Sequence, residues 1–452
     1  MDANAPMFQV SPFDSPLYGQ LLSDARTAQH LGDAAQIRAM LTVEGELALA
    51  QAETGLIPQD AADAIAAAAA SLTPDPASLA KGVASAGVPV PALVKALKEA
   101  LPAGHARWVH YGATSQDIVD TALILNIREI LIDHQARLLA VINGLADLAE
   151  THRGTLIAGR TRTQQAVPMS FGLKVAQWLA PLLHQLDRLD ELRPRLLRLQ
   201  LGGAVGTLAA MGEQAADINE RLAKRLGLAA GPCWHTQRDA LAELSGWLGL
   251  TTGSLGKMAQ DWLWLAQSEV GEIRFSNGGG SSTMPQKCNP VDAEIIVAMA
   301  RTSAAAVGQM HQTLLQEHER SGSAWTQEWF QLPQQLMASS VALRHALDGL
   351  RFIEIHDQRM RANLDAYNGV IYAEAATFEL ARSMGRDKAS DLVKQCAEEA
   401  LSGNRHLLQR IEDRTGEHID VDQLAQQLVA GGATGRWLTD ILEQARLKTA
   451  AA

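Results

Sequence analysis

The sequence predicts an all-α protein, and three observations support this fold class. Leu, Ala, Gln and Arg dominate the 452 residues, whereas aromatic residues make up only 4% and β-branched residues are sparse, which favours helices over strands. Apolar residues recur at helical spacing through several long segments. Gly and Pro gather between those segments, where they end helices. Because 47% of the residues are hydrophobic, the chain can bury a large core.

The first part of the chain, residues 1–108, is typical of short helices interrupted by Pro and Gly. An apolar stripe predicts a helix over residues 34–54, and an Ala-rich helix follows over residues 60–72. The stretch GVASAGVPVPALVKAL then predicts a Gly/Pro-rich loop before another helix begins near Ala92. We expect a small N-terminal helical domain.

Residues 109–355 carry the longest helical periodicity. One very long helix is predicted from Ser115 onward, and further long helices are expected over residues 171–200, 240–270, 290–316 and 332–355. Long amphipathic helices pack lengthwise into bundles, and apolar residues on more than one face indicate burial against other subunits. We therefore expect a long central bundle that oligomerises. Shorter helices separated by glycines predict a C-terminal helical domain over residues 356–452.

Charge and cysteine usage narrow the class of protein. The formal net charge is -11, and no Lys/Arg run is long enough to follow a phosphate backbone, which argues against a nucleic-acid partner. The three cysteines, Cys233, Cys288 and Cys396, lack the spacing of a zinc site or a disulfide framework, as expected in a reducing cytosol. Neither a signal peptide nor a window of about eighteen apolar residues is present. We expect a soluble cytoplasmic protein with no membrane partner.

The stretch GGGSSTMPQKCNP, residues 278–290, has the composition of an anion-binding loop. Its glycines allow unusual backbone angles, its serines supply hydroxyls and Lys287 supplies a cation. Asn289 and Pro290 fit the N-cap and first position of a following helix. Composition alone leaves open a simpler interpretation, a Ser/Gly linker followed by a capped helix.

Two further stretches combine residues that fit a structural role with residues that fit a binding site. In HYGATSQD, residues 110–117, Thr114 and Asp117 fit a capping box at the start of the long helix, where unpaired N–H groups also attract an anion. His110 taken alone is as compatible with a structural role as with a functional one. The third stretch is GRTRTQQAVP, residues 159–168.

These three stretches resemble the signatures GSSxMPxKxNP, HxGxTSxD and GRTHxQxAxP of the fumarase/aspartase superfamily. The resemblance implies an all-helical enzyme that interconverts a saturated carboxylate and an alkene by moving a proton next to the carboxylate, without a metal or organic cofactor. It implies that Ser281 carries the proton and that Ser282 is its neighbour. Substrate-binding residues implied by the same signatures are His110, Thr114, Ser115, Arg160, Arg162, Gln164, Ser282, Lys287 and Asn289.

Arg162 stands where the superfamily signature has histidine. Members that expel an amine or water need a proton donor for the leaving group, and an arginine cannot release its proton at neutral pH. In a lactonising enzyme the nucleophile is a carboxylate of the substrate itself, which needs a cation beside it and no proton. Arg162 therefore favours lactonisation, unless it only pairs with an acidic neighbour.

The stretches WHTQRD, residues 234–239, and QEHER, residues 316–320, resemble those of bacterial 3-carboxy-cis,cis-muconate cycloisomerases, a branch of the superfamily. The resemblance extends from about Gln36 to about Arg410. It implies closure of a tricarboxylate diene to 4-carboxymuconolactone, a step in protocatechuate breakdown, by a homotetramer whose sites combine several chains. Further substrate-binding residues implied by it are His235, Thr236, Gln237 and Arg320.

A trianionic substrate approaching an acidic protein needs a locally cationic pocket. We expect that pocket from the arginines and the lysine of the matching stretches, Arg160, Arg162, Arg238, Lys287 and Arg320. Three alternatives stay open: a cycloisomerase acting on 3-sulfomuconate, an adenylosuccinate or argininosuccinate lyase, and a crystallin-like structural protein. Arg162 argues against the lyases, and the intact loop chemistry of Ser281 and Lys287 argues against a structural protein.

Overall fold

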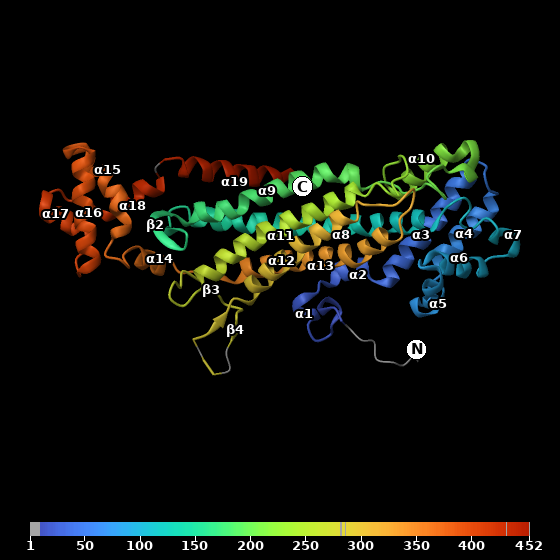
Figure 1. The fold of residues 1–452 in the computed structure, drawn as a ribbon, viewed down its shortest axis with the longest axis horizontal. Coiled ribbons are helices and arrows are strands. Elements are labelled where there is room, and N and C mark those ends of the chain that lie inside the picture. The colour runs from blue at the N-terminus through green and yellow to red at the C-terminus, as the bar shows by residue number, and fades with distance from the viewer. Residues whose placement is uncertain (1–9, 281–282, 285, 431, 452) are drawn as a thin grey trace. The chain divides into compact units, whose positions relative to one another are not determined.

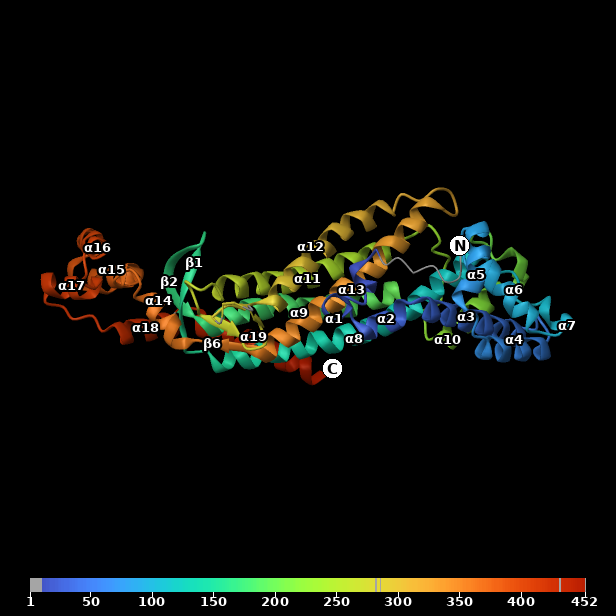
Figure 2. The same cartoon turned by 90° about the horizontal axis from the view of Figure 1, so that it is seen from below.

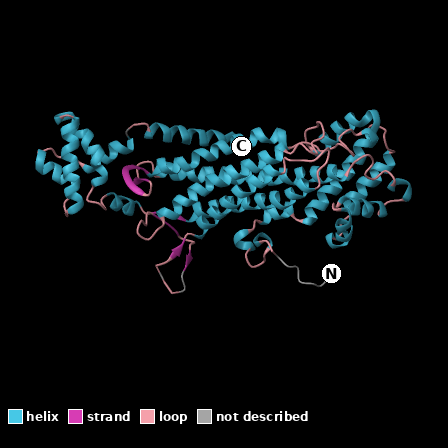
Figure 3. Cartoon of the chain, viewed as in Figure 1, coloured by secondary structure: helices cyan, strands magenta, loops and turns pink. Residues whose placement is uncertain are grey.

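The computed structural model describes residues 10–280, 283–284, 286–430 and 432–451. Helices dominate these residues, and the strands form short antiparallel pairs (Figure 3). The predicted all-α class is confirmed. The chain groups into two compact units: unit 1 comprises Met1–Ala136, Gln185–Gly253 and Met299–Ala342, and unit 2 comprises Arg137–His184, Ser254–Ala298 and Leu343–Ala452. The boundaries cut across the long helices, so the three-part division at residues 108 and 355 stays a prediction.

Short helices make up the first part of unit 1. They are η1 (Pro12–Asp14), α1 (Gly19–Leu22), α2 (Ala25–Leu31), α3 (Asp33–Glu53), α4 (Gln59–Ser71), α5 (Pro76–Ala86), α6 (Val90–Glu99) and α7 (Ala103–Ala106). The predicted helices over 34–54 and 60–72 are confirmed as α3 and α4. The loop predicted before Ala92 is wrong in its first part, because α5 continues to Ala86. Gly82 lies inside α5 where a Cβ atom would stand 2.7 Å from Ala92 Cβ, so this glycine allows α5 to pack closely on α6.

The five long helices each contribute a stretch to both units (Figure 1). They are α8 (Ser115–Thr151), α9 (Phe171–Leu196), α11 (Asp239–Leu265), α12 (Val291–Gln312) and α13 (Ser323–Phe352). In unit 1, Gln335 Nε2 on α13 donates to Ser245 O on α11 at 2.9 Å and to Ser303 O on α12 at 3.2 Å. Trp247 Nε1 on α11 donates to Gln185 O on α9 at 2.9 Å. These bonds satisfy buried polar groups and join the helices into a bundle.

Close packing joins the same helices within unit 2. Trp178 Nε1 on α9 donates to Asp261 Oδ2 on α11 at 2.6 Å. Gly349 on α13 leaves room for the Trp262 ring, since a Cβ atom there would lie 2.4 Å from it.

The remaining elements of unit 1 are η2 (Ala209–Gln214) and α10 (Ala215–Leu226).

Unit 2 contains the strands, which the sequence analysis did not predict. They are β1 (Leu156–Thr161), β2 (Gln164–Ser170), β3 (Ile273–Phe275), β4 (Gly279–Gly280), β5 (Cys288–Asn289) and β6 (Ile353–Ile355). Antiparallel pairing joins β1 to β2, which lie side by side in Figure 2. It also joins β3 to β6 and β4 to β5. Pro168 removes a backbone donor and disfavours a helix here, which is one reason that residues 156–170 form a hairpin.

Shorter helices form the C-terminal part of unit 2 around a core of their own, which includes Tyr372, Leu380 and Ile411. They are α14 (Asp357–Leu364), η3 (Val370–Tyr372), α15 (Ala373–Met384), α16 (Arg386–Ser402), α17 (Leu407–Thr415), α18 (Val421–Ala430) and α19 (Thr434–Ala451). Among the described helices, none has the length and apolar character required to cross a membrane.

Candidate active site

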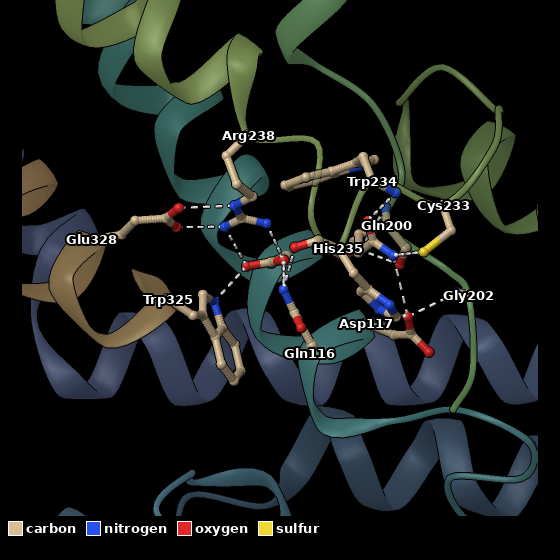
Figure 4. Close-up of polar contacts among 12 residues, drawn as sticks. Gln116, Asp117, Gln200, Gly202, Cys233, Trp234, His235, Arg238, Trp325 and Glu328 are labelled. Carbon is tan, nitrogen blue, oxygen red and sulfur yellow. Dashed lines mark hydrogen bonds and ion pairs between the residues drawn. The ribbon is translucent and has the colours of Figure 1, made fainter. Parts of the chain in front are cut away.

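The N-terminus of α8 is organised by the buried carboxylate of Asp117 (Figure 4). Asp117 Oδ2 accepts a 2.9 Å bond from the backbone N–H of Thr114, which is the carboxylate half of the predicted capping box. The same side chain accepts bonds from the backbone N–H groups of Gly202 and Gly203 at 2.8 and 2.9 Å. The carboxylate therefore fixes the start of α8 against the glycine loop that follows α9.

The hydroxyl of Thr114 is hydrogen-bonded to Arg320, another of the predicted substrate-binding residues. Arg320 Nη1 donates to Thr114 Oγ1 at 2.6 Å, and Ser115 beside it is half-buried. An exposed guanidinium thus lies next to a helix N-terminus, where both the dipole and the charge favour an anion. Among the predicted site residues, this contact brings Arg320 and Thr114 together.

His110 lies just before this helix start in the left-handed backbone region, with φ 62°. Its Nδ1 donates to Glu44 Oε1 at 2.6 Å, and Glu44 is buried. Burial lowers the pKa of His110, but the charge and hydrogen bond of Glu44 outweigh this effect and raise it. The histidine is therefore held in place by a carboxylate.

His235 is buried and also bonds to Asp117, with 2.8 Å between Nε2 and Oδ1. Burial lowers the pKa of His235, but hydrogen bonding to Asp117 and the Asp117 charge raise it to about 9. Cys233 lies next to it, where Gln200 Nε2 donates to its sulfur at 3.2 Å (Figure 4). In this single chain His235 supports Asp117 and, through it, the start of α8. Of its neighbours in the same stretch, Thr236 is half-buried and Gln237 is exposed.

The expectation that Arg238 contributes to a cationic pocket is wrong. Its side chain is fully buried, and it pairs with Asp120 at 2.6 Å and with Glu328 (Figure 4). Trp325 Nε1 donates to Asp120 Oδ1 at 3.0 Å and completes this network. Two carboxylates neutralise the guanidinium, so Arg238 joins α8, α11 and α13 and presents no charge to a ligand.

Arg160 on β1 belongs to unit 2, where it makes a bidentate ion pair. Both guanidinium nitrogens donate to the fully buried Glu272 at 2.8 Å, and Asn363 Nδ2 donates to the same carboxylate at 2.8 Å. Glu272 directly precedes β3, the strand that leads to the loop of residues 278–290. The positive charge of Arg160 is therefore balanced within the chain, and its pairing anchors the approach to that loop.

Arg162 and Thr163 form the two-residue turn of the β1–β2 hairpin, with φ values of 50° and 69°. Arg162 and Gln164 are both exposed. Within the part of the chain that the structure describes, no carboxylate lies within ion-pair distance of Arg162, which counts against the alternative that it only pairs with an acid. The hairpin presents an uncompensated cation at its tip.

The loop of residues 278–290 has a hairpin base. Gly279 pairs with Asn289 and Gly280 pairs with Cys288. Lys287 is exposed and Asn289 is half-buried. Ser281 and Ser282, the predicted proton carrier and its neighbour, lie outside the described residues.

The predicted site residues thus fall into two groups. Unit 1 holds His110, Thr114, Ser115, His235, Thr236, Gln237 and Arg320, and unit 2 holds Arg160, Arg162, Gln164, Lys287 and Asn289. The supporting carboxylates Asp117, Glu44 and Glu272 were missing from the predicted set. Asp117 stood inside a quoted motif and could have been included, whereas nothing in the sequence marks Glu44 or Glu272 as a partner of a distant His or Arg.

Comparisons with known proteins identify the family of this chain. A family described as lyase matches residues 14–304. A 3-carboxy-cis,cis-muconate cycloisomerase of Pseudomonas aeruginosa is 43% identical over 88% of this chain and 88% of its own length, and one of Acinetobacter baylyi is 37% identical over 91% and 93%. The crystal structure of a 3-carboxy-cis,cis-muconate lactonizing enzyme from Pseudomonas putida superposes with a TM-score of 0.91 at 37% identity, covering 96% of this chain and 100% of that one. The chain therefore belongs to the lyase family that includes these cycloisomerases.

Proposed function

We propose that this chain is a 3-carboxy-cis,cis-muconate cycloisomerase that forms 4-carboxymuconolactone in protocatechuate catabolism. The relatives named above support the proposal, because they carry this activity in their names and their similarity covers most of the chain. The observation that carries the choice of reaction is Arg162, an exposed cation at the position where a histidine would serve as acid or base.

The proposed chemistry is an intramolecular conjugate addition. A carboxylate oxygen of the substrate forms a bond to one alkene carbon, and the π electrons of that double bond move onto the carboxylate conjugated with it. Ser281 then gives its proton to the carbon between them and later regains one from solvent. The serine needs surroundings that stabilise its ionised form, and the intermediate carries a doubly charged carboxylate that must be stabilised.

Cationic groups and a helix start supply that stabilisation in the proposal. Arg162 pairs with the carboxylate that attacks in the forward direction and leaves in the reverse direction. Lys287 and Asn289 hold a second carboxylate close to Ser281. The start of α8, with Thr114 and Arg320, holds an anionic group through N–H donors, a hydroxyl and a guanidinium. No metal or organic cofactor takes part in the proposed reaction.

We further propose that the active assembly is a cytoplasmic homotetramer whose sites combine residues from several chains. Large apolar side chains stand exposed between α12 and α13 and at the start of α13, including Leu315 at 80% and Phe330 at 62%. Exposed apolar groups of this size are expected to be covered by another subunit. A diluted monomer should then lose its turnover per chain.

The test is a substrate panel with the purified protein. It is mixed separately with 3-carboxy-cis,cis-muconate, 3-sulfomuconate and adenylosuccinate, and the loss of diene absorbance or the release of fumarate is followed. Fast loss of absorbance with 3-carboxy-cis,cis-muconate supports the proposal. A comparable rate with 3-sulfomuconate extends the proposed activity to that substrate. Fumarate release with no reaction of either diene contradicts it, and no reaction with any of the three favours a structural protein or a substrate outside this panel.

A further inference from the structure

The base of the loop of residues 278–290 is built from glycines and backbone pairing. A Cβ atom at Gly278 would lie 2.3 Å from Cys288 Sγ and 2.8 Å from Asn289 O, so only glycine fits there. Cys288 Sγ donates to Phe275 O at 3.1 Å. The two arms of the loop therefore meet closely at its base, within unit 2.

A single carboxylate then joins the two flanks of this base. Asn277, directly before the glycines, donates from Nδ2 to Asp292 Oδ2 at 2.9 Å. Asp292 lies in the first turn of α12, directly after the loop. His345 Nδ1 on α13 donates to the other oxygen, Oδ1, at 2.6 Å, and the His345 side chain is only 4% exposed. The side chain of Asp292, just after the loop, is thus bonded both to Asn277, just before the loop, and to His345 on the neighbouring helix.

The hydrogen bonds of His345 favour a structural role for this group of residues over metal binding. Ligand atoms of Asp292, His345 and Asp348 lie within 4.8 Å of one another, as a metal would require. However, Arg344 Nη2 lies 3.2 Å from His345 Nε2 and can only donate to it, while His345 Nδ1–H donates to Asp292. Arg344 also lies 3.9 Å from Asp348. Both ring nitrogens are therefore occupied, and a guanidinium already supplies positive charge.

Electrostatics support the same interpretation. Burial raises the pKa of Asp292, but hydrogen bonds from His345 and Asn277, together with the charge of Arg344, lower it overall. The carboxylate stays ionised at neutral pH, so each of its oxygens can serve one donor.

We propose that Asp292 is a positioning residue that clamps both ends of the loop of residues 278–290 to α13 and thereby places Lys287 and Asn289. Its effect on turnover rests on the function proposed above. Its effect on the loop does not, because the clamp is made by side chains that contact the base of the loop and not the substrate.

Three variants test the clamp by exchanging its hydrogen-bond partners. Asp292→Asn replaces the charged acceptor with a neutral amide, so the bonds to Asn277 and His345 lose their charge-assisted strength. Asn277→Asp places two carboxylates face to face at an exposed position. The double variant Asn277→Asp with Asp292→Asn restores both bonds, because the new amide donates to residue 277 and its oxygen still accepts from His345. Asp348→Asn is the matched control, since Asp348 belongs to the same cluster but not to the loop base.

The first measurement is the rate of tryptic cleavage after the exposed Lys287, identified by fragment mass. Cleavage that requires local opening follows the population of the open form, so weakening the charge-assisted bonds of residue 292 should raise the rate about threefold to tenfold in Asp292→Asn. Asn277→Asp should raise it further, the double variant should return it close to wild type, and Asp348→Asn should leave it unchanged. Because residue 277 is exposed, Asn277→Asp decides the question even if Asp292→Asn does not fold.

The second measurement is turnover of 3-carboxy-cis,cis-muconate. Misplacing a reacting group should lower kcat about tenfold in Asp292→Asn, with a smaller change in KM, and the double variant should recover most of it. Unchanged cleavage in both single variants, or no recovery in the double variant, overturns the clamp. An effect of Asp348→Asn equal to that of Asp292→Asn also overturns it and points to a cation site. If no variant and not even the wild type turns over the diene, the proposed function fails while the cleavage rates still decide the clamp.

Discussion

Arg320 and Thr114 stand 206 positions apart in the sequence, yet Arg320 Nη1 donates to Thr114 Oγ1 at 2.6 Å. The bond places a guanidinium at the first turn of α8, where the helix dipole already favours negative charge. Asp117 holds the same turn from the buried side through the backbone N–H of Thr114. The helix start is thus fixed from within, and its outer side carries a cation suited to a carboxylate.

Replacing Arg320 should weaken this carboxylate site without unfolding the protein. We expect Arg320→Ala to lower kcat/KM for 3-carboxy-cis,cis-muconate by about tenfold to a hundredfold, since a charge-assisted bond is lost, and Arg320→Lys to lose less. Arg436→Ala is the control, because Arg436 is exposed and pairs with Asp440 one helical turn away. Wild-type kinetics in Arg320→Ala would remove Arg320 from the site.

Much of the fold could be predicted because helical periodicity is local information. The helices α3 and α4 begin and end within one residue of their predicted positions, and α8 and α11 begin within one residue of theirs. The extension of α5 to Ala86 was missed because it depends on Gly82 packing against Ala92, a contact between two helices. The β1–β2 hairpin was missed because its turn at Arg162 and Thr163 needs positive φ at residues that rarely adopt it.

The site was less predictable because charge compensation occurs between distant residues. Arg238 looks like a surface cation in sequence, and only the fold shows that Asp120 and Glu328 bury it. Arg160 is balanced by Glu272 for the same reason. The motifs identified which segments matter, whereas the burial of each charge depends on long-range contacts.

Arg162 can be tested by a substitution that keeps its backbone. Asn tolerates the left-handed conformation at φ 50°, so Arg162→Asn removes the cation while preserving the hairpin turn. We expect kcat/KM for the carboxylated diene to fall by about tenfold to a hundredfold, because the attacking carboxylate loses its counter-charge. Arg162→Gly is the matched control for the backbone and should behave like Arg162→Asn. Full activity in both variants would contradict the assigned role.

Ser281→Ala tests the proton carrier. Removing a general acid or base typically costs about two decades or more in kcat, and we expect that loss here with an unchanged melting temperature. Ser402→Ala serves as the control, because Ser402 is an exposed serine at the end of α16. Near-normal turnover in Ser281→Ala would refute the proton-transfer role.

Cys233 should react with alkylating reagents at lower pH than an ordinary thiol. Burial raises the pKa of Cys233, but the neighbouring His235 and the hydrogen bond from Gln200 lower it overall, whereas burial raises the pKa of Cys396. In a pH series with iodoacetamide, mass spectrometry of the peptides should show the labelling rate of Cys233 reaching its plateau below that of Cys396. Equal pH profiles for the two cysteines would contradict the thiolate assignment, and Cys233→Ser identifies the labelled peptide.

His235 should make stability fall at alkaline pH. Its pKa is raised from 6.5 to about 9 in the folded chain, mainly by Asp117, against the effect of burial. A raised pKa stabilises the fold fully below pH 6.5, and this contribution is lost as the pH rises through about 9. The loss should be on the order of 3 kcal/mol of unfolding free energy.

His235→Gln keeps a donor for Asp117 but does not titrate. In denaturant unfolding at pH 6.5 and 9.5, the unfolding free energy of that variant should therefore change less with pH. Both proteins carry Cys233→Ser, so that the neighbouring thiol does not titrate; because Cys233 also raises the pKa of His235, the loss in this background should be smaller than in the chain with Cys233. Both are compared at one chain concentration, because oligomer stability depends on it. Parallel pH dependence in the two proteins would mean that the His235–Asp117 pair does not stabilise the start of α8 through its charge.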